Sequence, residues 1–292
     1  SSDVCSSDLS ENPTLVVTPA DQIIMDPNAF EDALKKALFC ANEGSILTLG
    51  VVADHPATGY GYIKISGDKG LNDEYGVEEF KEKPSFETAE AYLATGQYFW
   101  NSGIFILKAN VWLEALNTFR ADIFETCLTT WKEREEHKKV TNLSTKLFAN
   151  IPSESIDYAV IEKCPGSQYE IKNIPLNAGW SDLGAWDAVW KSNKKDVNGN
   201  VLVGDTLTTE SANCFIHASS RLVASVGLKD TVVVETPDVV LIADQSQAQA
   251  IKSIVNQLEK AERSEKDTPR KVLRPWGWYD SIEEGAGFKV KR

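Results

Sequence analysis

The order of the first regular segments constrains the fold more than any other feature of the chain. Residues 14–17 form a short apolar run, a helical pattern begins at Pro27, and residues 46–52 form a second apolar run. Asp26 suits the N-cap of this helix, with Pro27 at its first position. A strand–helix–strand order of this length predicts a βαβ unit with a right-handed crossover. We therefore expect an α/β fold with a parallel sheet at this point, and residues 14–17 as a buried strand.

The later segments extend this pattern and then depart from it. Strands are expected at residues 61–66, 77–81, 99–107 and 169–175, and helices at 85–96, 110–136 and 156–163. Ser85 and Ser153 are the expected N-caps of the first and last of these helices. The charged residues 132–136 are expected to form a solvated helix face. From residue 200, short β segments separated by turns predominate, and a helix follows at 248–260. This change predicts a small stacked-β appendage.

These patterns divide the chain into four parts. Residues 1–9 repeat Ser-Ser-Asp without useful periodicity, so we interpret them as a disordered or foreign leader. Residues 10–195 are expected to form the α/β core, and residues 196–260 the β-rich appendage with its closing helix. Residues 261–292 begin with a charged linker, and the segment from residue 274 starts a further domain.

Composition excludes several classes of function. A formal net charge of −13 and a pI near 4.8 argue against a nucleic-acid partner, which would need a basic surface. The five cysteines have no CxxC spacing and the three histidines lie far apart, so reduced thiols are expected and a zinc site is not. No apolar run reaches the roughly 18 residues of a membrane span, and no signal peptide is recognisable. We expect a cytoplasmic protein without a membrane partner.

Two acidic residues follow apolar runs, in turns marked by Pro or Gly. Asp21 ends Thr-Pro-Ala-Asp, and Asp182 lies in Gly-Trp-Ser-Asp-Leu-Gly. Ligands of open α/β sheets gather at the carboxyl ends of strands, where two acids can hold a hard cation such as Mg²⁺ against phosphate oxygens. An Asx turn or a helix cap explains Asp21 taken alone equally well.

Further candidates lie between these acids. Asn101 interrupts an apolar strand, so its amide needs a partner, either a ligand hydroxyl near Gly103 or a neighbouring strand. Glu82 and Lys83 end a strand, where neighbouring side chains point to opposite faces. One could then reach a ligand while the other stabilises the loop, or both could form a surface ion pair. Gly61 suits a close backbone approach to a ligand, or a tight turn.

Taken in order, these motifs resemble the sugar-1-phosphate nucleotidyltransferases, and most closely the bifunctional mannose-1-phosphate guanylyltransferase family. The motifs are Asp21 after Pro19-Ala20, Thr-Gly-Tyr-Gly-Tyr-Ile at 58–63, Glu-Lys-Pro at 82–84, Trp-Asn-Ser-Gly-Ile-Phe at 100–105 and the Asp182 turn. Ser-Ile-Asp-Tyr-Ala-Val-Ile-Glu at 155–162 matches as well. Gln22 stands where this family usually carries His.

The resemblance implies a Rossmann-like nucleotidyltransferase core and a chemistry. An oxygen of mannose-1-phosphate attacks the α-phosphate of GTP, giving GDP-mannose for polysaccharide synthesis and pyrophosphate, with Mg²⁺ and Lys neutralising phosphate charge. Asp21 and Asp182 would hold the metal and Lys83 would meet the sugar phosphate. Gly61, Glu82, Asn101 and Gly103 would bind the sugar. Asp157 and Glu162 would shape the mannose end of the pocket, although helix capping or surface exposure explains these two acids almost as well.

The resemblance also has departures at both ends. The family opens with a Gly-rich strand–loop–helix that grips the triphosphate, and no such loop precedes residue 15. Residues 274–291 resemble the start of a phosphomannose isomerase domain. We therefore expect a piece of a longer protein that makes no GDP-mannose by itself. Two alternatives remain: a non-catalytic sugar-nucleotide-binding or regulatory subunit, and a related enzyme using UTP or dTTP. The sequence leaves room for a homo-oligomer.

Overall fold

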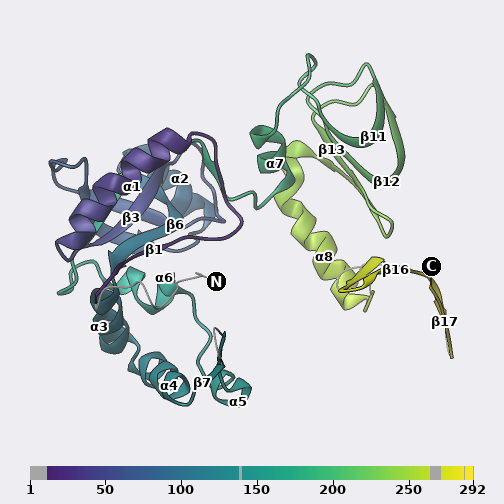
Figure 1. Ribbon diagram of the computed structural model, residues 1–292. Helices are drawn as coiled ribbons and strands as arrows, with labels where there is room; N and C mark the ends of the chain where they lie inside the picture. Colours follow the sequence, from purple (N-terminus) through teal and green to yellow (C-terminus); the bar gives the residue numbers. More distant parts are fainter. Residues whose placement is uncertain (1–11, 138–139, 264–270, 286, 292) are drawn as a thin grey trace. The chain divides into compact units, whose positions relative to one another are not determined.

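The computed structural model describes residues 12–137, 140–263, 271–285 and 287–291 (Figure 1). The chain forms two compact units, residues 1–180 and residues 181–292. The expected leader at 1–9 lies outside the described residues, as does most of the expected linker after residue 261. Among the helices of the described ranges, none is long and apolar enough to cross a membrane.

The first unit is built on a six-stranded mixed sheet. Its strand order is β1 (Thr14–Val17), β6 (Tyr98–Lys108), β3 (Ile46–Val52), β9 (Ile171–Pro175), β5 (Tyr75–Lys81) and β4 (Tyr62–Ser66). The expected α/β fold is confirmed, but the sheet around the first two apolar runs is not parallel as expected. Strand β6 lies between β1 and β3 and is antiparallel to both, so these two strands run in the same direction one strand apart. The parallel pair is β3 with β9.

Strand β1 is not the buried strand that its sequence suggested. It occupies one end of the sheet and is paired with β6 on one side. Val16 and Val17 are each 38% exposed in consequence. An apolar run of four residues does not distinguish an edge strand from an interior one, because pairing depends on distant segments.

Helices cover both faces of this sheet (Figure 1). Helix α1 (Pro27–Asn42) packs with Leu47, Leu49 and Ile174 on one face. Its N-cap is Asp26 as predicted, with the Asp26 carboxylate accepting from the amides of residues 28 and 29. The opposite face packs on α3 (Ala109–Phe119), α4 (Ala121–Lys132), α6 (Ile156–Ala159) and the 3₁₀ turn η1 (Ile161–Lys163). Helix α2 (Phe86–Thr95) begins at Ser85, as expected.

Two helix predictions need correction. Helix α4 ends at Lys132, and β7 (Glu135–His137) pairs with β8 (Val140–Asn142) where a helix face was expected. Acidic residues at 133, 135 and 136 would lie at a helix C-terminus, where the helix dipole disfavours negative charge. The N-cap of α6 is Ser155 rather than Ser153, and this helix stops at Ala159 because Val160 leaves helical geometry. A four-residue helix, α5 (Thr145–Phe148), precedes it.

The predicted β-rich carboxy-terminal region is confirmed in the second unit. Strands β11 (Val201–Thr209), β12 (Phe215–Val226) and β13 (Thr231–Glu235) pair in parallel, and β14 (Val240–Asp244) closes this sheet antiparallel to β13. Helix α7 (Trp186–Ser192) packs against the apolar side of the sheet. The turn η2 (Gln245–Ala250) and helix α8 (Ile251–Lys260) follow, and β15 (Lys271–Arg274), β16 (Gly277–Gly285) and β17 (Phe288–Lys291) form a separate small sheet.

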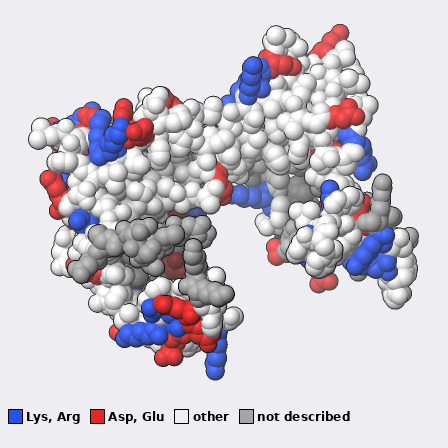
Figure 2. Space-filling view, in the orientation of Figure 1, with Lys and Arg blue, Asp and Glu red and all other residues white. Residues whose placement is uncertain are grey.

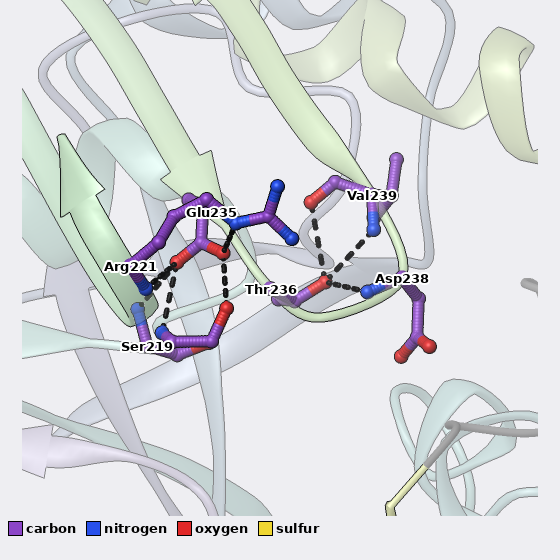
Figure 3. Close-up of polar contacts among 7 residues, drawn as sticks. Ser219, Arg221, Glu235, Thr236, Asp238 and Val239 are labelled. Atoms are coloured by element: carbon purple, nitrogen blue, oxygen red, sulfur yellow. Dashed lines mark hydrogen bonds and ion pairs between the residues drawn. The ribbon is translucent and has the colours of Figure 1, made fainter. Parts of the chain in front are cut away.

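A buried carboxylate holds an irregular stretch of β12 (Figure 3). Residues 215–218 of β12 pair with β13 and residues 223–226 pair with β11, which leaves residues 219–222 outside the ladders. The Glu235 carboxylate accepts from the amides of Ser219 and Ser220 at 3.0 and 2.9 Å and pairs with Nε of Arg221 at 3.0 Å. The Ser220 hydroxyl also donates to it, and this bond is the largest cause of a Glu235 pKa lowered to about 2.

Candidate active site

Asn101 is the centre of a polar cluster on the face of the sheet that α6 covers. Its Nδ2 donates to the carboxylate of Asp157 at 2.9 Å, and its Oδ1 accepts from the amide of Gly103 at 3.0 Å. The hydroxyl of Thr48 lies 3.5 Å from the same Oδ1. Strand β6 and helix α6 therefore supply the partners that this strand amide needed, and the side chain is held in one orientation.

Gly61 lets the parts of this cluster approach one another. The amide of Asn101 donates to the carbonyl of Gly61 at 2.8 Å. A Cβ at position 61 would overlap the Glu82 carboxylate and would lie 3.2 Å from Cβ of Asn101. The glycine is required here because the carboxylate of Glu82 occupies the space of its missing side chain.

Glu82 and Lys83 point the same way, which corrects the expectation of opposite faces. Nζ of Lys83 lies 3.1 Å from Oε1 of Glu82. The reason is local: Lys83 has a φ of +45°, so the chain has left strand geometry at this residue. The side chain of Glu82 is 10% exposed and that of Lys83 is 59% exposed. The pair therefore has a buried acidic end and an accessible cationic end.

The electrostatics of the cluster follow from burial and crowding of like charges. Burial raises the pKa of Glu82, and the negative charges of Asp157 and Glu162 raise it further against the opposing effect of Lys83. Burial also raises the pKa of Asp157. The hydrogen bond to Glu82 raises the pKa of Lys83, which stays cationic. Glu162 lies in η1, and its Oε1 is 3.5 Å from Nζ of Lys81. Buried carboxylates beside one accessible ammonium suit a ligand with hydroxyls and an anionic group.

The turn that carries Asp21 packs against this cluster. Gly103 has a φ of +73°, and a Cβ there would lie 3.1 Å from Cγ of Pro19. Gln22 donates through Nε2 to the carbonyl of Ser102 at 2.5 Å and accepts at Oε1 from the indole of Trp180 at 2.9 Å. Strand β2 (Ile23–Ile24) pairs with β10 (Trp180–Ser181) beside these bonds. Sequence reasoning missed the role of Gln22, although its position next to Asp21 was a usable signal.

The two acids expected to hold a metal have suitable donor chemistry. Asp21 is exposed, and Asp182 is half-buried with its carboxylate accepting from the amide of Gly184 at 3.1 Å. Carboxylate oxygens are the donors that hard divalent cations prefer. Within the described residues no group of three or more His, Cys, Asp or Glu side chains could hold a metal.

Charged side chains of both signs mix on one face of the protein (Figure 2). Figure 2 shows Lys and Arg interspersed with Asp and Glu on the face that it draws. Ion pairs such as the one between Arg134 and Glu136, at 2.9 Å, join charges of opposite sign.

Comparison with known families decides the class of the protein. The family model described as "Nucleotidyl transferase" matches residues 4–199, more than half of the chain. The chain belongs to the nucleotidyl transferase family. A second family model, "MannoseP isomerase/GMP-like beta-helix domain", matches residues 204–258 of this nucleotidyl transferase. The predicted resemblance to sugar nucleotidyltransferases, a family of enzymes, is confirmed.

Relatives of this nucleotidyl transferase carry more specific names. It is 39% identical over 285 residues to a mannose-1-phosphate guanylyltransferase of Escherichia coli strain K12, covering 96% of this chain and 59% of the relative. It is 41% identical over 278 residues to the alginate biosynthesis protein AlgA of Pseudomonas aeruginosa, covering 95% of this chain and 57% of the relative. The chain thus spans less than two thirds of the length of these relatives.

Two solved structures are similar to this chain. A structure described as mannose-1-phosphate geranyltransferase from Thermus thermophilus aligns with a TM-score of 0.71 and 29% identity, covering 84% of this chain and 70% of the other. A structure described as mannose-6-phosphate isomerase from Helicobacter pylori aligns with a TM-score of 0.51 and 35% identity, covering 57% of this chain and 64% of the other.

Proposed function

We propose that this protein is a mannose-1-phosphate guanylyltransferase, which forms GDP-mannose and pyrophosphate from GTP and mannose-1-phosphate. The observation that carries the proposal is the ammonium of Lys83 held on the buried carboxylate of Glu82, beside the Asn101–Asp157 pair. This arrangement offers hydroxyl acceptors and donors next to one cation. The relatives named for this reaction support the same assignment.

Each residue of the cluster has a role in the proposed reaction. Glu82 and Asp157 accept hydrogen bonds from sugar hydroxyls. The side-chain amide of Asn101 orients the Asp157 carboxylate. Lys83 binds the sugar phosphate, whose oxygen attacks the α-phosphate of GTP while pyrophosphate leaves. Gly61 makes room for the sugar-binding carboxylate of Glu82, Gly103 makes room for Pro19 beside Asn101, and Glu162 bounds the mannose end. The protein accelerates such a transfer mainly by positioning both substrates and neutralising charge.

Members of this family generally use a divalent metal ion. The ion proposed here is Mg²⁺, with Asp21 and Asp182 as its protein ligands. Bound there, Mg²⁺ would neutralise the charge that builds on the phosphate oxygens. The hydrogen bond from the Gly184 amide holds the Asp182 carboxylate in its turn.

The proposal also assigns domains, a cellular location and partners to this protein. The proposed domains are residues 10–195 for catalysis, 196–260 for the β-rich appendage and 261–292 for a linker and the start of an isomerase domain. The protein would act in the cytoplasm, supply GDP-mannose for polysaccharide synthesis, have no nucleic-acid or membrane partner and leave room for a homo-oligomer.

The test incubates the purified protein with Mg²⁺, mannose-1-phosphate and GTP, and measures GDP-mannose and pyrophosphate. Parallel reactions replace GTP by UTP or dTTP, and mannose-1-phosphate by glucose-1-phosphate. Equilibrium binding of mannose-1-phosphate is measured on the same sample. Mg²⁺-dependent GDP-mannose formation supports the proposal, and turnover with UTP or dTTP alone favours the related enzyme. Binding without turnover agrees both with the expectation that this chain makes no GDP-mannose by itself and with a sugar-nucleotide-binding or regulatory subunit, and absence of both contradicts the assignment.

A further inference from the structure

Asn173, in the middle of strand β9, is a fully buried amide whose hydrogen bonds are unmet. Its exposed fraction is 0%, and neither Oδ1 nor Nδ2 has a hydrogen-bond partner within the part of the chain that the structure describes. Buried polar side chains almost always have partners, because an unpaired one destabilises the folded state. A fully buried strand position that shares its face with the core residue Ile171 would favour an apolar residue unless the amide binds something else.

The amide of Asn173 points toward the Asn101 cluster. A Cβ on Gly50 would overlap Oδ1 of Asn173 and lie 2.8 Å from its Nδ2, so the amide covers this glycine. Gly50 is directly opposite Asn101 on β6, and Asn173 is directly opposite Thr48 on β3. Residues opposite each other in a sheet share a face.

A polar row therefore crosses three adjacent strands. It runs from Asn173 on β9 through Thr48 on β3 to Asn101 on β6, with the Thr48 hydroxyl 3.5 Å from Oδ1 of Asn101. The row ends at Asp157, which Asn101 contacts at 2.9 Å. Asn101 has its partners within the chain, whereas Asn173 at the other end has none among the described residues.

We propose that Asn173 is a further sugar-binding residue, which extends the site inward from Asn101 along this row. Its amide takes one hydroxyl group, either of the bound sugar itself or of one buried water that bridges to the sugar. A hydroxyl is the fitting chemistry, because it can donate to Oδ1 and accept from Nδ2. Gly50 is the residue that allows the amide to lie beside Asn101. The inference rests on the proposed function, since it assigns a contact within that site.

The test compares three variants of the full chain. Asn173→Leu keeps a similar volume and removes both polar atoms, and Asn173→Ser keeps one hydroxyl in case the leucine variant does not fold. Ile171→Val is the control, because Ile171 is buried on the same strand and face. Each protein is titrated with mannose-1-phosphate by calorimetry and unfolded in urea.

We expect Asn173→Leu to unfold at the same or a higher urea concentration, because no unpaired amide is buried, while its affinity for mannose-1-phosphate falls about tenfold. Asn173→Ser should lose less affinity. Ile171→Val should lower the urea midpoint and leave affinity unchanged. Deoxy analogues show which sugar hydroxyl Asn173 serves. With direct contact or with a bridging water, the one deoxy sugar phosphate that lacks this hydroxyl should bind wild type and Asn173→Leu alike, and an equal loss for every analogue would contradict a contact with the sugar.

Two results would overturn the inference in different ways. If wild type binds mannose-1-phosphate and both Asn173 variants bind it equally well, Asn173 is a structural residue and the proposed function stands. If wild type binds no sugar phosphate, the proposed function fails together with this extension of it.

Discussion

The indole Nε1 of Trp180 donates a hydrogen bond of 2.9 Å to Oε1 of Gln22, 158 residues earlier in the chain. The same amide donates through Nε2 to the carbonyl of Ser102. Gln22 follows Asp21, Ser102 follows Asn101, and Trp180 precedes the Asp182 turn. One side chain therefore fixes three segments that carry proposed site residues.

Replacing Gln22 by Leu should lower the free energy of unfolding by about 1–3 kcal/mol, because the indole of Trp180 and the carbonyl of Ser102 lose their partner. Urea unfolding measures this effect. Gln168→Leu is the control, because residue 168 is exposed, and its change should stay within about 0.5 kcal/mol. Equal small effects of both substitutions would show that Gln22 does not join these segments.

Gly61→Ala should weaken binding of mannose-1-phosphate about tenfold, which corresponds to losing about one charge-assisted hydrogen bond. The new Cβ would displace the Glu82 carboxylate from its place beside Lys83. Gly59→Ala, measured by the same calorimetric titration, is a matched control, since a Cβ at residue 59 meets nothing within 4 Å. Unchanged binding in Gly61→Ala would remove Glu82 from the sugar site.

Asp182→Asn should abolish metal-dependent turnover in a full-length version of the protein. In the present chain it should weaken binding of Mn²⁺, which stands in for Mg²⁺ and is measured by electron paramagnetic resonance. The amide keeps an oxygen that can accept from Gly184, so the turn is preserved while the charge is lost. Asp187→Asn is the control, because this acid pairs with Lys191 within α7. A variant at 182 with wild-type turnover and ion binding would rule out the metal assignment.

Glu235→Gln should destabilise the protein at neutral pH and much less in acid. The Glu235 carboxylate has a pKa lowered to about 2 in the folded state, against about 4.3 in an unfolded chain. Its contribution to stability is therefore full above about pH 4.3 and is lost as the pH falls through 2. Thermal unfolding of both proteins between pH 7 and pH 3 should show a difference in Tm that narrows below about pH 4.3. A difference independent of pH would show that charge on Glu235 is not the cause.

The sequence predicted what is determined locally. The cap at Asp26 and the strand at residues 46–52 follow from neighbouring residues, and both are found as expected. The insertion of β6 between β1 and β3 depends on pairing between residues about 90 positions apart, such as Thr14 with Lys108, and no local pattern specifies it.

The candidate site divides in the same way. Asn101 was identified because a polar residue interrupts an apolar strand, and Asn173 carries the same signal in β9 but was missed. The shared direction of Glu82 and Lys83 could not be predicted, because it depends on a positive φ at a residue that is not glycine. The bonds of Gln22 join residues that are adjacent only in the folded chain.

The central claim is that Lys83, held on Glu82 beside Asn101, binds a sugar phosphate. Calorimetric titration of mannose-1-phosphate into wild type and Lys83→Ala tests it most directly, with Lys69→Ala as a control for an exposed lysine paired with Asp73. The account predicts saturable binding to wild type and to the control, and affinity about tenfold weaker or lost in Lys83→Ala. Equal affinity in all three proteins, or no binding to wild type, would contradict it.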